Sequence, residues 1–77
     1  MEIRVFIVDA FSGETIHNMW TEHSLVPIPN DTINIGLFKD FVVARRELQY
    51  CYDDEYGYQT LCSIVLYVYE KPINKEG

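Results

Sequence analysis

The spacing of apolar residues limits the fold of this chain more than any other feature, because they alternate over short runs and keep a helical period for no more than a turn or two. Alternation with a period of two is typical of strands, whose successive side chains point to opposite faces. Five such runs occur, separated by residues that favour turns. We therefore predict an all-β fold in which four to five antiparallel strands form a strongly bent sheet or an SH3-like small barrel, with at most a short helical turn.

The length of the chain accommodates one small domain, since it has 77 residues, of which 48% are hydrophobic. We assign residues 1–70 to a single β domain and residues 71–77, which include Pro72 and charges of both signs, to a flexible C-terminal tail. A core of this size supplies only about 3 to 5 kcal/mol of stability. Domains this small commonly gain stability from a partner subunit, a metal or a disulfide.

Turn-forming residues place the first strands. Gly13 separates the runs at residues 3–8 and 15–21, which predicts a hairpin, because glycine adopts a positive φ at little cost. Pro27 and Pro29 follow, and neither can donate a backbone hydrogen bond to a sheet. The segment that contains these prolines is therefore predicted to be a connecting loop.

A second hairpin is predicted to join residues 32–35 to a long strand at residues 41–52. The apolar residues of the long strand change parity halfway: Phe41 and Val43 share one parity, and Leu48, Tyr50 and Tyr52 share the other. An extra residue in one strand of a pair would restore a common face for both sets. We therefore predict a β-bulge at residues 44–46, which would also bend the sheet.

The two cysteines, Cys51 and Cys62, each lie within an apolar segment that reads as a strand. Residues 1–9 lack the long hydrophobic region of a secretory signal, because charged residues interrupt them. We therefore expect a cytoplasmic protein whose cysteines are reduced and packed rather than bridged.

These features together resemble the short all-β, small-barrel proteins of phages and mobile elements. The resemblance covers nearly the whole chain and rests on an opening strand at residues 2–9, a proline-rich connector leading into residues 30–35, a bulged strand at residues 41–50 and an aromatic closing strand. It includes no matched functional motif. What it implies is an origin, and a role as an inhibitor or sequesterer directed at host machinery.

The most conspicuous segment places four tyrosines around three consecutive carboxylates. Tyrosine combines a rigid apolar ring with a hydroxyl group and is enriched at recognition hot spots. The predicted partner-binding residues are Tyr50, Tyr52, Asp53, Asp54, Glu55, Tyr56 and Tyr58. The alternative is an ordinary hairpin tip, in which the acids are solvated, a glycine forms the turn and the tyrosines pack on neighbouring strands.

Arg45, Arg46 and Trp20 are candidate ligand-binding residues. Successive strand residues point to opposite faces, so the two arginines can act together only if a bulge redirects one of them. One guanidinium could then hold a phosphate with its two parallel donors. The alternative is an intramolecular ion pair with Asp53, Glu47 or an acid on a neighbouring strand.

The net charge of −6 disfavours direct binding to nucleic acid or to an anionic membrane. An acidic chain can also mimic DNA, but this one approaches the charge density of a duplex only at residues 53–55. The histidines and cysteines show no metal-ligand spacing, and no nucleophile or phosphate-loop motif is present. We predict no catalytic residues, no metal and no cofactor.

The leading hypothesis is a non-enzymatic protein-binding module that inhibits a host protein, such as a defence protein, through the acidic tyrosine segment. One alternative is an oligomer that sequesters a small phosphorylated or nucleotide signal, and another is a structural module of a larger particle. The run at residues 61–69 has apolar residues of both parities, and one small sheet cannot easily cover both faces of it. We therefore expect a homo-oligomer.

Overall fold

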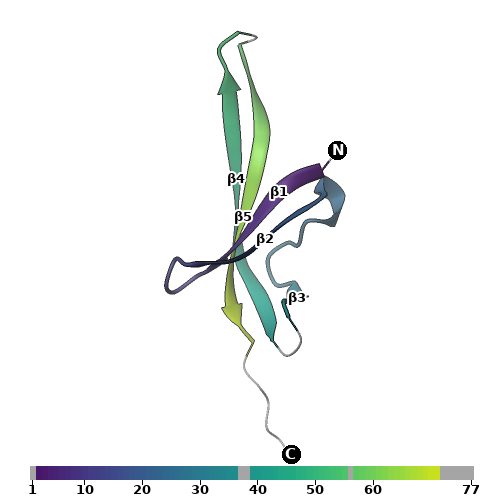
Figure 1. Cartoon of the computed structure of the whole chain (residues 1–77), viewed down its shortest axis with the longest axis vertical. Helices are drawn as coiled ribbons and strands as arrows, with labels where there is room; N and C mark the ends of the chain where they lie inside the picture. Colours follow the sequence, from purple (N-terminus) through teal and green to yellow (C-terminus); the bar gives the residue numbers. More distant parts are fainter. Residues whose placement is uncertain (1, 37–38, 56, 72–77) are drawn as a thin grey trace, which may run out of the picture.

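The computed structural model describes residues 2–36, 39–55 and 57–71, which form one five-stranded sheet (Figure 1). Its elements are β1 (Glu2–Asp9), β2 (Thr15–Glu22), the short 3-10 turn η1 (His23–Leu25), β3 (Thr32–Asn34), β4 (Asp40–Asp53) and β5 (Tyr58–Glu70). The all-β prediction is confirmed, including the two hairpins and the single helical turn. The C-terminal tail beyond Lys71 lies outside the described residues.

The strands follow the order β2-β1-β5-β4-β3, and β1 pairs with β5 in parallel, whereas the other three pairs are antiparallel. The β1–β5 pair departs from the predicted antiparallel arrangement. Parallel strands are usually buried on both faces and read as nearly continuous apolar runs. β1 and β5 have that composition, so these two strands join the β1–β2 hairpin to the β3-β4-β5 part of the sheet.

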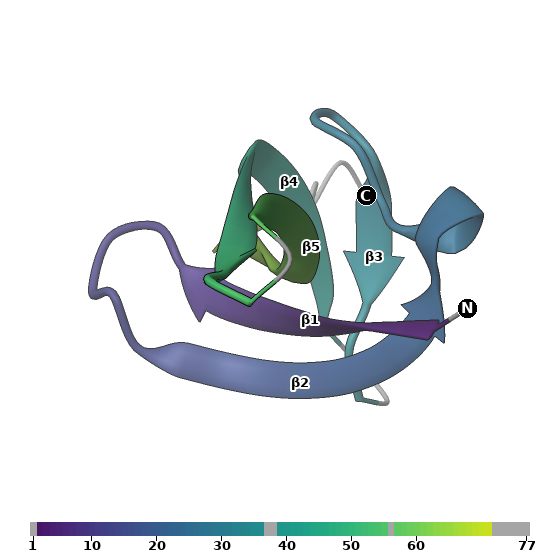
Figure 2. The same cartoon turned by 90° about the horizontal axis from the view of Figure 1, so that it is seen from above.

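Three irregularities in strand pairing accompany the strong curl of the sheet into a half-barrel, seen from above in Figure 2. Ala44 is the extra residue between Val43, opposite Val68, and Arg45, opposite Tyr67, so the predicted bulge is confirmed. A second register shift leaves Cys62 as the extra residue of β5, and a third lies in the β1–β2 pair. Bulges increase the local twist of a strand, which curls a narrow sheet.

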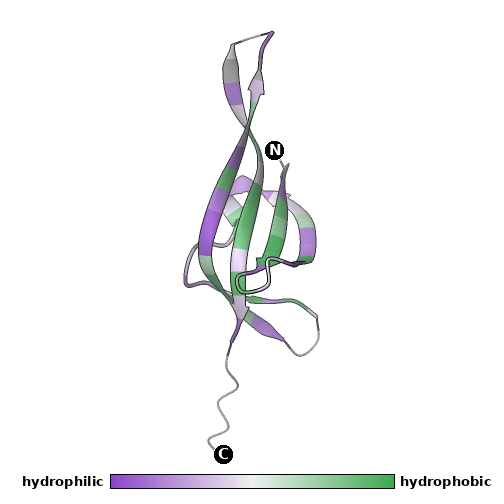
Figure 3. Cartoon of the chain, turned by 90° about the vertical axis from the view of Figure 1, so that its left-hand side faces the viewer, coloured by the Kyte–Doolittle hydropathy of each residue, from purple (hydrophilic) through white to green (hydrophobic). Residues whose placement is uncertain are grey.

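The core lies on the concave face of this half-barrel. Six side chains there are at most 1% exposed: Val5, Ile7, Val43, Ile64, Leu66 and Val68. Val26, from the proline-containing connection, adds a further buried side chain to the cluster. Figure 3 shows hydrophobic residues gathered on the inner strands of the sheet. The core is therefore built where the β1–β2 hairpin pairs with β5.

The outer face of β5 is also partly covered by the chain itself. Val65 is 7% exposed and lies in register with Phe6 of β1 and Glu47 of β4. Tyr67 and Tyr69 on the same face are half-buried. The apolar residues of both parities in this strand are thus accommodated largely within one copy of the chain.

Candidate functional site

The distal half of the β4–β5 hairpin projects beyond the rest of the sheet (Figure 1). β1 pairs with β5 only from Ser63 to Val68, so within the described chain residues 58–62 pair with β4 alone. We call residues 49–53 and 58–62, with the turn between them, the arm. An isolated two-stranded ribbon is marginally stable in water, so an arm of this length needs additional support.

The arm has such support in a disulfide between Cys51 of β4 and Cys62 of β5. The two Cα atoms lie 5.7 Å apart, because Cys62 is the extra residue of a bulge that brings it diagonally across from Cys51. This separation is typical of disulfides. The expectation of a reduced pair is therefore wrong for this structure, since parity alone could not reveal the register that joins the two sulfurs.

A stripe of large side chains follows one face of β4 from Leu48, just before the arm, to Tyr52 within it. Leu48, Tyr50 and Tyr52 are alternate residues, so they share a face, and they are 42%, 55% and 62% exposed. Leu48 lies opposite the fully buried Ile64, so the stripe begins at the core. Exposure rises outward because β1 no longer pairs along the arm. We call these three residues the stripe.

The structure describes part of the predicted partner-binding segment. Tyr50 and Tyr52 belong to the stripe, and Asp54 and Glu55 are exposed in the turn that ends the arm. Tyr56 and the side chains of Asp53 and Tyr58 lie outside the described residues. Tyr50, Tyr52, Asp54 and Glu55 thus lie at the same end of the molecule.

The candidate ligand-binding arginines lie on opposite faces of β4, so the bulge does not bring them together. Arg46 lies opposite the buried Leu66, whereas Arg45 lies opposite Tyr67. The Arg45 guanidinium stacks 3.7 Å from the centre of the Tyr67 ring and lies 3.7 Å from a Glu47 carboxylate oxygen. The Tyr67 hydroxyl donates to the same carboxylate over 2.9 Å. The alternative of an intramolecular ion pair is therefore confirmed for Arg45.

Trp20, the third candidate, belongs to a cluster that the sequence analysis missed. The Arg4 guanidinium lies between the rings of Phe6 and Trp20, 5.3 and 5.4 Å from their centres, and donates to Asn18 Oδ1 over 3.0 Å. Alternation in the sequence already places Arg4 and Phe6 on one face of β1. The sequence does not reveal the strand register, which sets Trp20 opposite Arg4.

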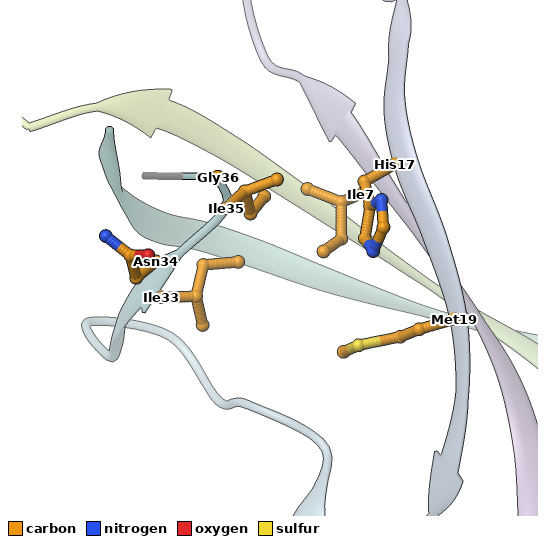
Figure 4. A pocket seen from close by; sticks show the side chains of 7 residues that line it. All are labelled: Ile7, His17, Met19, Ile33, Asn34, Ile35 and Gly36. Atoms are coloured by element: carbon orange, nitrogen blue, oxygen red, sulfur yellow. The ribbon is translucent and has the colours of Figure 1, made fainter. Parts of the chain in front are cut away.

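A cavity of about 360 Å³ opens on the concave side between the two edge strands (Figure 4). Its walls are formed by Ile7, His17 and Met19 on one side and by Ile33, Asn34 and Ile35 on the other. The lining is mostly aliphatic, and the Asn34 amide nitrogen already donates to Lys39 O and Asp40 Oδ1. The cavity therefore offers few polar groups to orient a ligand.

Within residues 2–36, 39–55 and 57–71, no cluster of three or more His, Cys, Asp or Glu side chains could hold a metal ion. No helix in that part of the chain is long and apolar enough to span a membrane. Comparisons with family models, curated proteins and solved structures find no match to this chain. A functional proposal for this chain therefore draws on its own geometry.

Proposed function

We propose that this chain is a non-enzymatic protein-binding module and that the arm is its contact surface. The observation that carries the proposal is the stripe, whose three large side chains are 42%, 55% and 62% exposed on a hairpin that projects from the core. Exposed aromatic side chains are costly to leave in water and are enriched at the centres of protein interfaces. A partner that covers the stripe would remove this cost.

The arm contributes little to the core, which supports a role other than stability. Within the described residues, the buried side chains come from other parts of the chain, and the first buried residue beyond the arm is Ser63. The disulfide nevertheless holds the arm in one register. A contact surface that is ordered before it binds loses less conformational entropy on binding, which favours affinity.

The charge of the arm indicates the chemistry of the partner. Asp54 and Glu55 are exposed at its end, and the chain as a whole has a net charge of −6. A partner surface with Lys and Arg around an apolar groove would match both the turn and the stripe, and opposite charges would speed their encounter. Because such steering is screened by salt, the association rate should fall as ionic strength rises.

The resemblance to short phage and mobile-element proteins suggests that the partner is a host protein, such as a defence protein, and that binding inhibits it. A cytoplasmic location stays a prediction, and the Cys51–Cys62 disulfide counts against it, because disulfides are rare in that compartment. The alternatives of a small-signal sequesterer and of a structural module stay predictions. Arg45, which the sequesterer would use, is engaged by Glu47 and Tyr67.

The proposal is tested by native mass spectrometry of the protein purified gently from a host lysate. A variant with Asp53→Ala, Asp54→Ala and Glu55→Ala should lose a protein-sized partner that the wild type retains. The matched control changes three exposed acids elsewhere, Glu2→Ala, Glu14→Ala and Glu70→Ala, and alters the net charge equally. Equal loss in both variants would attribute binding to overall charge, and equal retention would exclude the acidic turn from the interface.

A further inference from the structure

We infer that the free edge of β2 is a self-association surface, at which two copies of the chain pair their β2 strands antiparallel about a two-fold axis at Asn18. The inference is independent of the arm, which lies along other strands. The sheet order leaves two edges, β2 and β3, in the described chain. In Figure 2, β2 runs along the outside of the sheet with β1 on its inner side.

The two edges differ in how well they can accept another strand. β3 has three residues, and the side chain of its last residue, Asn34, donates hydrogen bonds to Lys39 O and Asp40 Oδ1. β2 has eight residues, and neither proline nor lysine occurs in it. Short length, proline, lysine and β-bulges are devices by which proteins protect an edge strand against pairing. The β2 edge is long and lacks proline and lysine; its one bulge leaves Ile16 as the extra residue, so the pairing with β1 is regular from His17 to Glu22.

The backbone groups of β2 that face outward follow from the hydrogen bonds of β1. The Ala10 N–H donates to Val68 O over 2.8 Å, and the Asp9 N–H donates to Glu14 O over 2.8 Å, so even residues of β1 face β5 and odd residues face β2. Ile7 and Val5 therefore bond to their register partners in β2. The residues between those partners, including Asn18, direct their N–H and C=O groups to the free edge.

The edge is self-complementary when it is centred on Asn18. In an antiparallel pair about a two-fold axis, Asn18 lies opposite its own copy, and both N–H and C=O groups can exchange bonds there. Trp20 then lies beside the partner subunit's Ile16, the extra residue of the bulge in β2, and the contact occurs twice. Ile16 and Trp20 are 38% and 59% exposed, so pairing would cover apolar surface on both copies. A two-fold axis at Asn18 also brings more residues of β2 into the paired segment than an axis at Trp20 would.

Charge opposes this association and gives it a signature. Each copy has a net charge of −6, and Glu14 and Glu22 border the paired segment. Repulsion between like-charged copies is screened by salt, so the dimer should become tighter as ionic strength rises. Binding of a basic partner by the arm should respond in the opposite direction, which separates the two surfaces.

The test is sedimentation analysis of the purified protein over a range of concentrations and salt. The wild type should approach twice the 9.1 kDa monomer mass at high concentration, and more so at high salt. Ile16→Glu should weaken association about tenfold, because it removes two apolar contacts per dimer. Ile16→Val should retain it, and Thr32→Glu on the β3 edge should change it by less than about twofold, as a control of equal charge.

A second measurement locates the two-fold axis. Residues directly opposite in a hydrogen-bonded pair have Cα atoms about 5.5 Å apart, which a disulfide can span. Asn18→Cys should therefore give a covalent dimer in air faster than Thr32→Cys does. A monomer at about 1 mM protein, or a dimer that Ile16→Glu leaves unchanged, would overturn the inference, as would equal crosslinking by the two cysteine variants.

Discussion

Cys62 of β5 is the extra residue of a bulge, and that displacement brings it within bonding reach of Cys51, which lies diagonally across the arm. The bulge and the disulfide therefore act together. They fix the register of the arm, a two-stranded ribbon with which β1 does not pair. The bulge and the disulfide, rather than the core, therefore position the exposed stripe and the acidic turn.

Removing the disulfide should loosen the arm. Closing a loop with a sequence separation of 11 residues stabilises a fold by about 2 to 3 kcal/mol in the chain-entropy model. Cys51→Ser combined with Cys62→Ser should lower the free energy of unfolding by that amount. Hydrogen exchange should quicken at the amides of residues 49–53 and 58–62 before those of β1. Equal protection of the arm in both proteins would show that it is ordered without the bond.

Truncation of a side chain should cost much stability at the centre of the core and little at the exposed stripe. Leu66 is fully buried, so Leu66→Ala should cost about 2 to 5 kcal/mol, which is comparable to the whole stability of a domain this small. The matched change Leu48→Ala, at a residue 42% exposed, should cost under about 1 kcal/mol. Urea denaturation of both variants measures the difference. Similar costs would contradict the placement of the core.

The β1–β2 turn should lose stability in acid. Asp9 Oδ1 accepts hydrogen bonds from the backbone N–H groups of Phe11 and Ser12, over 2.7 and 3.0 Å. The bonds from Ser12 and then Phe11 lower the pKa of Asp9 below its ordinary 3.8. A lowered folded pKa contributes stability above the unfolded pKa, and that contribution disappears as the pH falls through the folded value.

Asp9→Asn keeps an acceptor oxygen but cannot ionise, so it is the appropriate comparison. Wild type should be the more stable protein at neutral pH, and the difference should vanish as the pH falls below the folded pKa of Asp9. Urea denaturation at several pH values measures this difference. A gap that is constant with pH would show that the charge of Asp9 does not contribute.

The Arg4 cluster should stabilise the β1–β2 pair and report on it optically. Arg4→Lys keeps the charge but loses the planar guanidinium between Phe6 and Trp20, at a cost of about 0.5 to 2 kcal/mol. The fluorescence of Trp20, the single tryptophan, should change with it. Arg45→Lys disturbs the stack on Tyr67 instead and should leave the tryptophan emission unaltered. Identical spectra for the two variants would contradict the cluster.

Local pattern was sufficient to predict the strands, both hairpins and the bulge. The parity change between Val43 and Leu48 has few explanations other than an extra residue, and Ala44 supplies it. The position of Tyr50 and Tyr52 on one face follows from alternation in the same way. These features depend on residues that are close in the sequence.

Pairing between distant strands could not be predicted from the same patterns. The parallel contact of β1 with β5 depends on how the β1–β2 hairpin meets the β3-β4-β5 part of the sheet, which no local residue determines. The Arg4–Trp20 cluster and the Cys51–Cys62 bond both depend on register, and a shift of one residue would change the partner of each side chain. The projection of the arm follows from strand lengths, which local pattern places only approximately.

The central claim, that the stripe contacts a partner, is tested most directly by comparing partner capture by two double variants. Tyr50→Ser with Tyr52→Ser removes the aromatic part of the stripe, and Phe11→Ser with Ile28→Ser removes two side chains that are 88% and 52% exposed elsewhere. We predict that native mass spectrometry finds the partner on wild type and on the second variant, and not on the first. Capture of the same protein by the tyrosine variant at the wild-type level would contradict the claim.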